Sequence, residues 1–96
     1  MPRYELSKEA ERDLENILSF GIDAFGFDQA IRYYDGLEQH FEQLAEQPYL
    51  YAAVDYIREG YRRSVYGVHA VYYRLIDHGI EIMAVIGKQE FSARKN

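Results

Sequence analysis

The stretch from Ile57 to Leu75 constrains the fold more than any other part of the sequence. It is rich in β-branched and aromatic residues, contains no proline, and is divided by Gly60 and Gly67, which is typical of two strands joined by a turn. The second half carries apolar side chains on both faces of the predicted strand, because successive side chains point to opposite faces. Such a strand usually lies inside a sheet that is covered, wholly or in part, on both sides. We therefore expect a central β-hairpin that the rest of the chain covers.

Two amphipathic helices are predicted between Ser7 and Pro48. Ser7 precedes an acidic first turn, which suits a helix N-cap. From there, apolar residues recur at spacings of three and four towards Gly26. After Gly26, Asp28 can cap a second helix that ends at Pro48. Since the link is short, the helices should pack antiparallel as a hairpin on the sheet, and Gly36 in the second helix suggests close approach to a neighbour.

The apolar stripe and the polar face of the first helix can be assigned from the same spacing. The stripe contains Ala10, Leu14, Ile17, Leu18, Gly21 and Phe25. The opposite face, expected to point to solvent, contains Glu9, Arg12, Asp13 and Asn16.

Two further segments complete the predicted sheet. Arg3–Leu6 alternates in polarity and is interpreted as an edge strand, and residues 80–86 form a strongly apolar strand after a turn that contains glycine. The order predicts an α+β fold in which an N-terminal strand, an antiparallel helical hairpin and a three-stranded antiparallel sheet form one helix layer on one sheet. The length of 96 residues predicts a single domain over residues 1–96, with residues 87–96 as a C-terminal tail.

The charges are unevenly distributed along the chain. The net charge is −5, but residues 1–56 hold 4 Lys/Arg against 12 Asp/Glu, whereas residues 57–96 hold 7 against 4. An acidic total argues against nucleic-acid binding as the main task, so we expect no direct sequence-specific binding of nucleic acid by the chain alone. There is no cysteine and the three histidines show no ligand spacing, so no metal and no other cofactor are expected. No apolar run suits a membrane span or a signal peptide, which predicts a cytoplasmic protein.

A family resemblance runs from Tyr4 to Ile86. Its most specific piece is Ile57-Arg58-Glu59-Gly60-Tyr61-Arg62-Arg63, followed by Gly67-Val68-His69 and Tyr72-Tyr73-Arg74. In these motifs and in its order of predicted elements, the sequence resembles the ParE toxins of the RelE/ParE superfamily of type II toxin–antitoxin systems. The resemblance implies a toxin that inhibits DNA gyrase and that a ParD-like antitoxin neutralises. The sequence departs from the ParE pattern after the last strand, at Gly87-Lys88-Gln89-Glu90-Phe91.

Candidate binding residues lie in both halves of the chain. The residues predicted to contact the target are Arg58, Arg62, Arg63, Arg74, Lys88 and Phe91. Solvation and ion pairing with the acidic helices are the alternative role of these arginines. The residues predicted to contact the antitoxin, on the apolar helix faces, are Leu14, Leu18, Phe25, Tyr33 and Leu37.

A ribosome-dependent mRNA endonuclease of the RelE branch is the alternative from a different class. Cleavage of RNA needs a base for the 2′-hydroxyl, a cation at the phosphate and an acid for the leaving group. The candidates for these roles are Glu59, Arg63, His69 and Tyr73. Docking on ribosomal RNA calls for many lysines and this chain has three. In addition, His69 is more often a hydrogen-bonded sheet histidine than a general base. We therefore expect no catalytic residues and no enzymatic activity. A third alternative is an inactive member that only binds an antitoxin.

Overall fold

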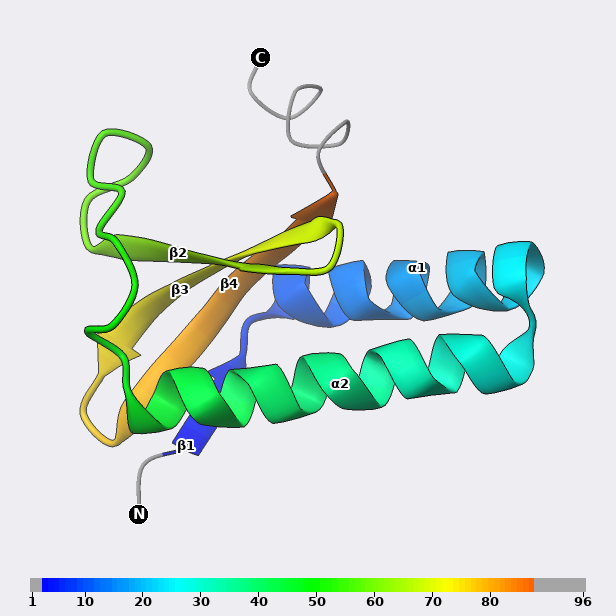
Figure 1. The fold of residues 1–96 in the computed structure, drawn as a ribbon. Coiled ribbons are helices and arrows are strands. Elements are labelled where there is room, and N and C mark those ends of the chain that lie inside the picture. Colours follow the sequence, from blue (N-terminus) through cyan, green and yellow to red (C-terminus); the bar gives the residue numbers. More distant parts are fainter. Residues whose placement is uncertain (1–2, 88–96) are drawn as a thin grey trace.

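The computed structural model describes residues 3–87, and its elements follow the predicted order (Figure 1). The elements are β1 (Arg3–Leu6), α1 (Lys8–Phe25), α2 (Phe27–Glu46), β2 (Tyr61–Tyr66), β3 (His69–Ile76) and β4 (Gly79–Gly87). The predicted hairpin is confirmed, although its first strand begins at Tyr61 and not before Gly60. The predicted tail, with Lys88 and Phe91, lies outside the described residues apart from Gly87.

The four strands form one mixed sheet in the order β1-β4-β3-β2. β1 pairs with β4 in parallel, whereas β2, β3 and β4 pair antiparallel along the chain. β3 is an inner strand, as its two apolar faces predicted. Both helices lie on one side of the sheet, and their joined ends extend beyond it (Figure 1). The α+β class and the single helix layer are confirmed.

The ends of the helices are set by Ser7 and Gly26. The Ser7 hydroxyl accepts a hydrogen bond from the Ala10 amide at 3.1 Å, which confirms the predicted N-cap. Gly26, at φ 92°, is the only residue between the two helices, and glycine adopts this backbone conformation without steric cost. The prediction that Asp28 caps α2 was wrong: α2 begins at Phe27 without a side-chain cap, and Asp28 lies in its first turn.

The main core lies between the helices and the sheet. Strands β3 and β4 contribute Val71, Tyr73, Ile80, Ile82 and Val85, which pack against buried residues of both helices. A β-bulge makes this possible, because the register passes from Tyr72↔Ala84 to Tyr73↔Ile82 and leaves Met83 as an extra residue. Without that residue, the alternation that buries Ile80 and Ile82 would turn Val85 away from the helices.

Tyr33 and Tyr66 fasten α2 to the β2–β3 hairpin at two glycines. A Cβ atom at Gly36 would overlap the Tyr66 hydroxyl, and a Cβ atom at Gly67 would overlap the Tyr33 ring. The close approach predicted for Gly36 is therefore confirmed, and its partner is Tyr66.

Asp13 corrects the predicted polar face of α1. Its side chain is only 3% exposed, and its carboxylate accepts a hydrogen bond from the Val85 amide at 2.9 Å. The prediction placed Asp13 in solvent because helical spacing does not show where a sheet edge needs a hydrogen-bond acceptor.

Candidate functional site

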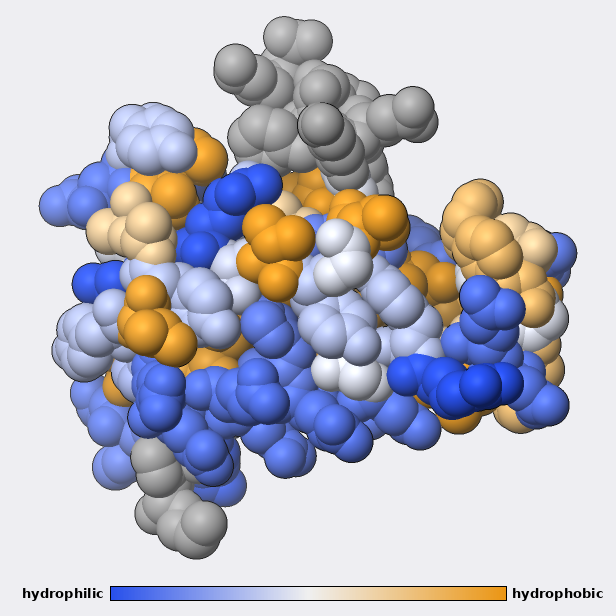
Figure 2. All heavy atoms as spheres, viewed as in Figure 1, coloured by the Kyte–Doolittle hydropathy of each residue, from blue (hydrophilic) through white to orange (hydrophobic). Residues whose placement is uncertain are grey.

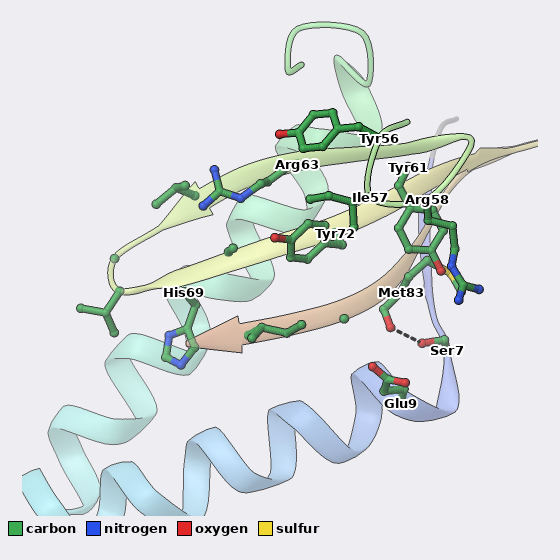
Figure 3. A pocket seen from close by; sticks show the side chains of 16 residues that line it. Ser7, Glu9, Tyr56, Ile57, Arg58, Tyr61, Arg63, His69, Tyr72 and Met83 are labelled. Carbon is green, nitrogen blue, oxygen red and sulfur yellow. Dashed lines mark hydrogen bonds between the residues drawn. The ribbon is translucent and has the colours of Figure 1, made fainter. Parts of the chain in front are cut away.

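The helix-free face of the sheet forms an open groove of about 1410 Å³, which we call the sheet groove (Figure 3). Its floor comes from β3 and β4, where Ala70 pairs with Ile86 and Tyr72 pairs with Ala84. These four side chains are buried and form a second apolar cluster with Val54 and half-buried Tyr61. Alternation along the strands therefore gives β3 a role in two clusters, one on each face.

The walls of the sheet groove carry opposite charges. Arg63 projects from β2, and Arg58 projects from the loop before it with its guanidinium 5.7 Å from the centre of the Tyr61 ring. Ser7 and Glu9, at the start of α1, line the groove beyond β4, across the sheet from Arg63 (Figure 3). Within residues 3–87, neither Arg58 nor Arg63 forms an ion pair. As far as residues 3–87 are concerned, an anionic partner could meet these two guanidiniums without breaking a salt bridge.

The other two arginines predicted to contact a target are held by the protein itself. Arg62 points to the helix side, where its Nη1 donates to the Tyr51 carbonyl at 2.6 Å and its guanidinium lies 5.0 Å from the Tyr49 ring centre. Arg74 donates through Nε and Nη2 to one carboxylate oxygen of Glu81, at 2.9 and 2.6 Å. The four arginines therefore do not form one continuous stripe.

The candidate ribonuclease residues do not converge on one point. Arg63 lines the sheet groove, and Glu59 lies exposed in the loop before β2. Tyr73 is buried beneath the helices, where its hydroxyl donates to the Pro48 carbonyl at 2.8 Å and burial raises its pKa to about 12. That hydroxyl is unsuited to proton transfer near neutral pH.

His69 is tied to α2, which confirms the expectation of a hydrogen-bonded sheet histidine. Its Nδ1 lies 2.7 Å from the Tyr33 hydroxyl, which also contacts the Tyr66 carbonyl at 3.1 Å. This contact joins the start of β3 to α2, so the ring nitrogen that faces Tyr33 is already engaged within the fold.

The five residues predicted to contact an antitoxin have different accessibility. Leu14 and Leu37 are buried in the main core, and Leu18 and Tyr33 are half-buried. Phe25 is 61% exposed, because the joined ends of the helices extend beyond the sheet that would have covered it. Figure 2 shows apolar surface at this end, where Phe20 and Phe27 are also exposed.

Several residues of the sheet groove were not predicted from the sequence. Tyr56 is 85% exposed and Ile57 is also exposed, both at the loop wall. Ile57 was predicted to begin the first strand of the hairpin, but that strand begins at Tyr61. Ser7 was recognised only as a helix cap, although its hydroxyl also donates to the Met83 carbonyl (Figure 3). Among residues 3–87 there is no group of three His, Asp or Glu side chains that could hold a metal ion. Nor is any helix in that range long and apolar enough to cross a bilayer.

Comparison with known proteins identifies the family. The family described as "ParE toxin of type II toxin-antitoxin system, parDE" matches residues 4–90. The chain belongs to the ParE toxin family. Toxin ParE1 of Caulobacter vibrioides is 35% identical over 94 residues, which cover 98% of this chain and 96% of that protein. Toxin ParE1 of Mycobacterium tuberculosis is 36% identical over 85 residues, which cover 88% and 87%.

Solved structures share the ParE-type fold of this chain. A chain from a chromosomal ParDE toxin–antitoxin system of P. aeruginosa superposes with a TM-score of 0.76 at 16% identity, over 91% of this chain and 96% of the other. A conserved hypothetical protein from Helicobacter pylori superposes with a TM-score of 0.63 at 15% identity, over 95% and 99%. At such identities the likeness concerns the fold alone.

Proposed function

We propose that this ParE-family toxin binds DNA gyrase and blocks it without catalysing a reaction, and that a ParD-like antitoxin neutralises it in the cytoplasm. The observation that carries the proposal is the family match over residues 4–90. The site geometry supports a non-enzymatic mode of action, because Glu59, Arg63, His69 and Tyr73 do not meet at one point. Inhibition then rests on the area and charge of a binding surface.

Arg58 and Arg63 are the proposed target contacts within the described residues. Both line the sheet groove and neither is ion-paired within residues 3–87, whereas Arg62 and Arg74 already have acceptors. A basic wall beside an apolar floor suits a partner surface that is acidic and partly apolar. Lys88 and Phe91 remain proposed contacts because they follow the last strand in the sequence, where the family resemblance implies contact with the target.

A supercoiling assay tests the target. Relaxed plasmid is incubated with purified gyrase and ATP, with increasing amounts of the chain. The wild-type chain should stop supercoiling, and the double variant Arg58→Ala/Arg63→Ala should need about tenfold more protein, the effect of losing roughly 1.4 kcal/mol of binding free energy. Arg74→Ala is the matched control, because it removes an arginine already paired with Glu81. Supercoiling that continues at all concentrations of wild-type chain would rule out gyrase as the target.

Two further measurements separate the remaining alternatives. Isothermal titration with the cognate ParD-like antitoxin should show tight binding, and no heat of binding would contradict the proposed partner. In a translating extract, mRNA should stay intact when the chain is added. Cleavage that Arg63→Ala abolishes would instead assign the chain to the RelE branch. A chain that binds antitoxin but leaves both gyrase and mRNA unaffected would be an inactive member.

A further inference from the structure

The outer edge of β2 is paired over only half of its length. The Arg63 amide donates to the Ala52 carbonyl at 3.1 Å, and the Tyr61 carbonyl accepts from the Val54 amide at 2.8 Å. These bonds show that the main-chain groups of Tyr61 and Arg63 point away from β3. Because main-chain direction alternates along a strand, the N–H and C=O groups of Val65 point the same way. Within residues 3–87, neither group has a hydrogen-bond partner.

The chain itself shows that this edge accepts an added strand. Residues 52–54 run antiparallel to the first half of β2, with Ala53 opposite Arg62. The segment then leaves the edge at Tyr51, since the Tyr51 carbonyl accepts from Arg62 Nη1 and the Tyr51 ring packs 6.2 Å from the His40 ring. The edge from Ser64 to Tyr66 is therefore uncovered by residues 52–54.

The side chains next to this uncovered edge define the kind of segment that would fit. Val65 is 55% exposed and Val68, in the following turn, is 75% exposed. Val65 and Val68 both line the mouth of the sheet groove with Arg63. An extended segment lying here would place alternate apolar side chains beside the two valines and an acidic side chain beside Arg63.

Charge distinguishes between the possible occupants. The stretch from Ile57 to Tyr66 holds three arginines and one glutamate. Pairing with the same edge of a second copy would bring these like charges together, which disfavours association. An acidic segment of another protein would be attracted instead.

We propose that an extended, acidic and partly apolar segment of the antitoxin adds to the sheet as a fifth strand along β2, hydrogen-bonded to the main chain of Val65. This inference rests on the proposed antitoxin partner. It adds a defined docking mode, in which main-chain bonds to Val65 supply affinity, and Val65, Val68 and Arg63 select the side chains of the segment.

A proline substitution tests the main-chain bonds. Val65→Pro removes the outward N–H without removing a bond to β3, and proline is tolerated where an edge strand faces solvent. In titrations with the purified cognate ParD-like antitoxin, Val65→Pro should bind about tenfold or more weakly, and the control Val65→Thr should stay within about threefold of wild type, because it keeps the amide. Circular dichroism and urea unfolding of both variants show whether the fold is retained. Equal affinity of a folded Val65→Pro variant and wild type would overturn the proposal.

Hydrogen exchange of the wild-type chain gives a second measurement that needs no variant. On adding antitoxin, the Val65 amide should exchange on the order of 100-fold more slowly, because it becomes part of a paired strand. An unchanged Val65 amide in a chain that binds antitoxin would overturn the docking mode and leave the proposed function standing. Protection that rises with protein concentration without antitoxin would show that a second copy occupies the edge, and would also overturn it. Failure of wild-type chain to bind antitoxin would overturn the proposed partner itself and, with it, this inference.

Discussion

The outer sides of β4 and β2 are each covered by a short extended segment over only part of their length, and the two strands differ in what satisfies the remaining main-chain groups. At β4, the parallel strand β1 runs only as far as Ile82, and the start of α1 completes the edge. The Ser7 amide donates to the Ile82 carbonyl at 3.0 Å, the Ser7 hydroxyl donates to the Met83 carbonyl at 3.1 Å, and Asp13 accepts from the Val85 amide. At β2, the neighbouring segment is a loop, and within residues 3–87 the outward main-chain groups of Val65 have no hydrogen-bond partner. A helix that starts beside an edge can therefore close that edge with side chains.

The largest effect should come from Asp13, whose carboxylate closes the edge of β4. Asp13→Ala removes the acceptor of the Val85 amide and leaves that buried donor unpaired, which should lower the free energy of unfolding by about 2 kcal/mol. Urea unfolding measures the loss, and the Val85 amide should exchange faster. Asp13→Asn is the control, because its amide oxygen can still accept and its effect should be smaller. An Asp13→Ala variant as stable as wild type would show that the edge does not depend on this bond.

A smaller effect is expected at Ser7, whose hydroxyl both caps α1 and donates to Met83. Ser7→Ala removes both bonds and should cost about 1 to 2 kcal/mol of stability. Ser7→Asp separates the two roles, because a carboxylate can accept from the Ala10 amide but cannot donate to the Met83 carbonyl. Thermal unfolding should rank wild type first, Ser7→Asp second and Ser7→Ala last. Equal stability of the two variants would mean that the cap contributes nothing beyond the bond to β4.

The covered half of the β2 edge should depend on Arg62. Arg62→Ala removes the bond to the Tyr51 carbonyl and the contact with the Tyr49 ring. Their loss should lower the free energy of unfolding by about 1 kcal/mol. The amides of Val54 and Arg63 should then exchange faster, while the Val85 amide at the other edge should not change. Arg58→Ala is the control, since the Arg58 guanidinium contacts Tyr61 and has no hydrogen bond within residues 3–87, while alanine keeps the main-chain amide that donates to the Val54 carbonyl at 3.2 Å. Faster exchange at both edges would show that the edges are coupled.

Most of the fold could be predicted from the spacing of apolar residues and from the residues that begin or end helices and strands. Ser7, Gly26 and Pro48 located the helices because capping and backbone constraints act within a few residues. The two-faced pattern of β3 likewise identified an inner strand. Asp13 could not be placed, since helical spacing shows which residues share a face and not which acceptor an edge strand requires. The bulge at Met83 was also beyond prediction, because it depends on the register between β3 and β4.

The candidate site was predicted less completely, because its residues depend on strand register and loop position. Arg58 and Arg63 were recognised among the basic residues, and both line the sheet groove. Arg62 is the immediate neighbour of Arg63, and alternation turns it to the opposite face. Arg74 could be distinguished from the arginines of the groove only when the register between β3 and β4 was known, because that register places Glu81 beside it. Tyr56 lies in a loop whose sequence has no repeating pattern, and Ile57, which was predicted to lie in the first strand, belongs to the same loop because β2 begins only at Tyr61.

The smallest expected effect is a pH dependence of stability that depends on His40, next to β2. His40, on α2, lies with Nε2 2.7 Å from the Ser64 hydroxyl on the inner side of β2, and burial lowers the pKa of His40 from its ordinary value of 6.5. The unfolded chain therefore takes up this proton more readily than the folded chain. The contribution of neutral His40 to stability is fully present above pH 6.5 and falls as pH drops from there towards the folded-state pKa. His40→Gln should lose less stability than wild type between pH 7.5 and pH 5, and comparing the two in urea at each pH cancels the titration of the carboxylates. The Arg63 amide should lose protection in acid more than the Val85 amide, after correction for intrinsic exchange. Parallel pH profiles for the two proteins would show instead that His40 titrates alike in the folded and unfolded chains.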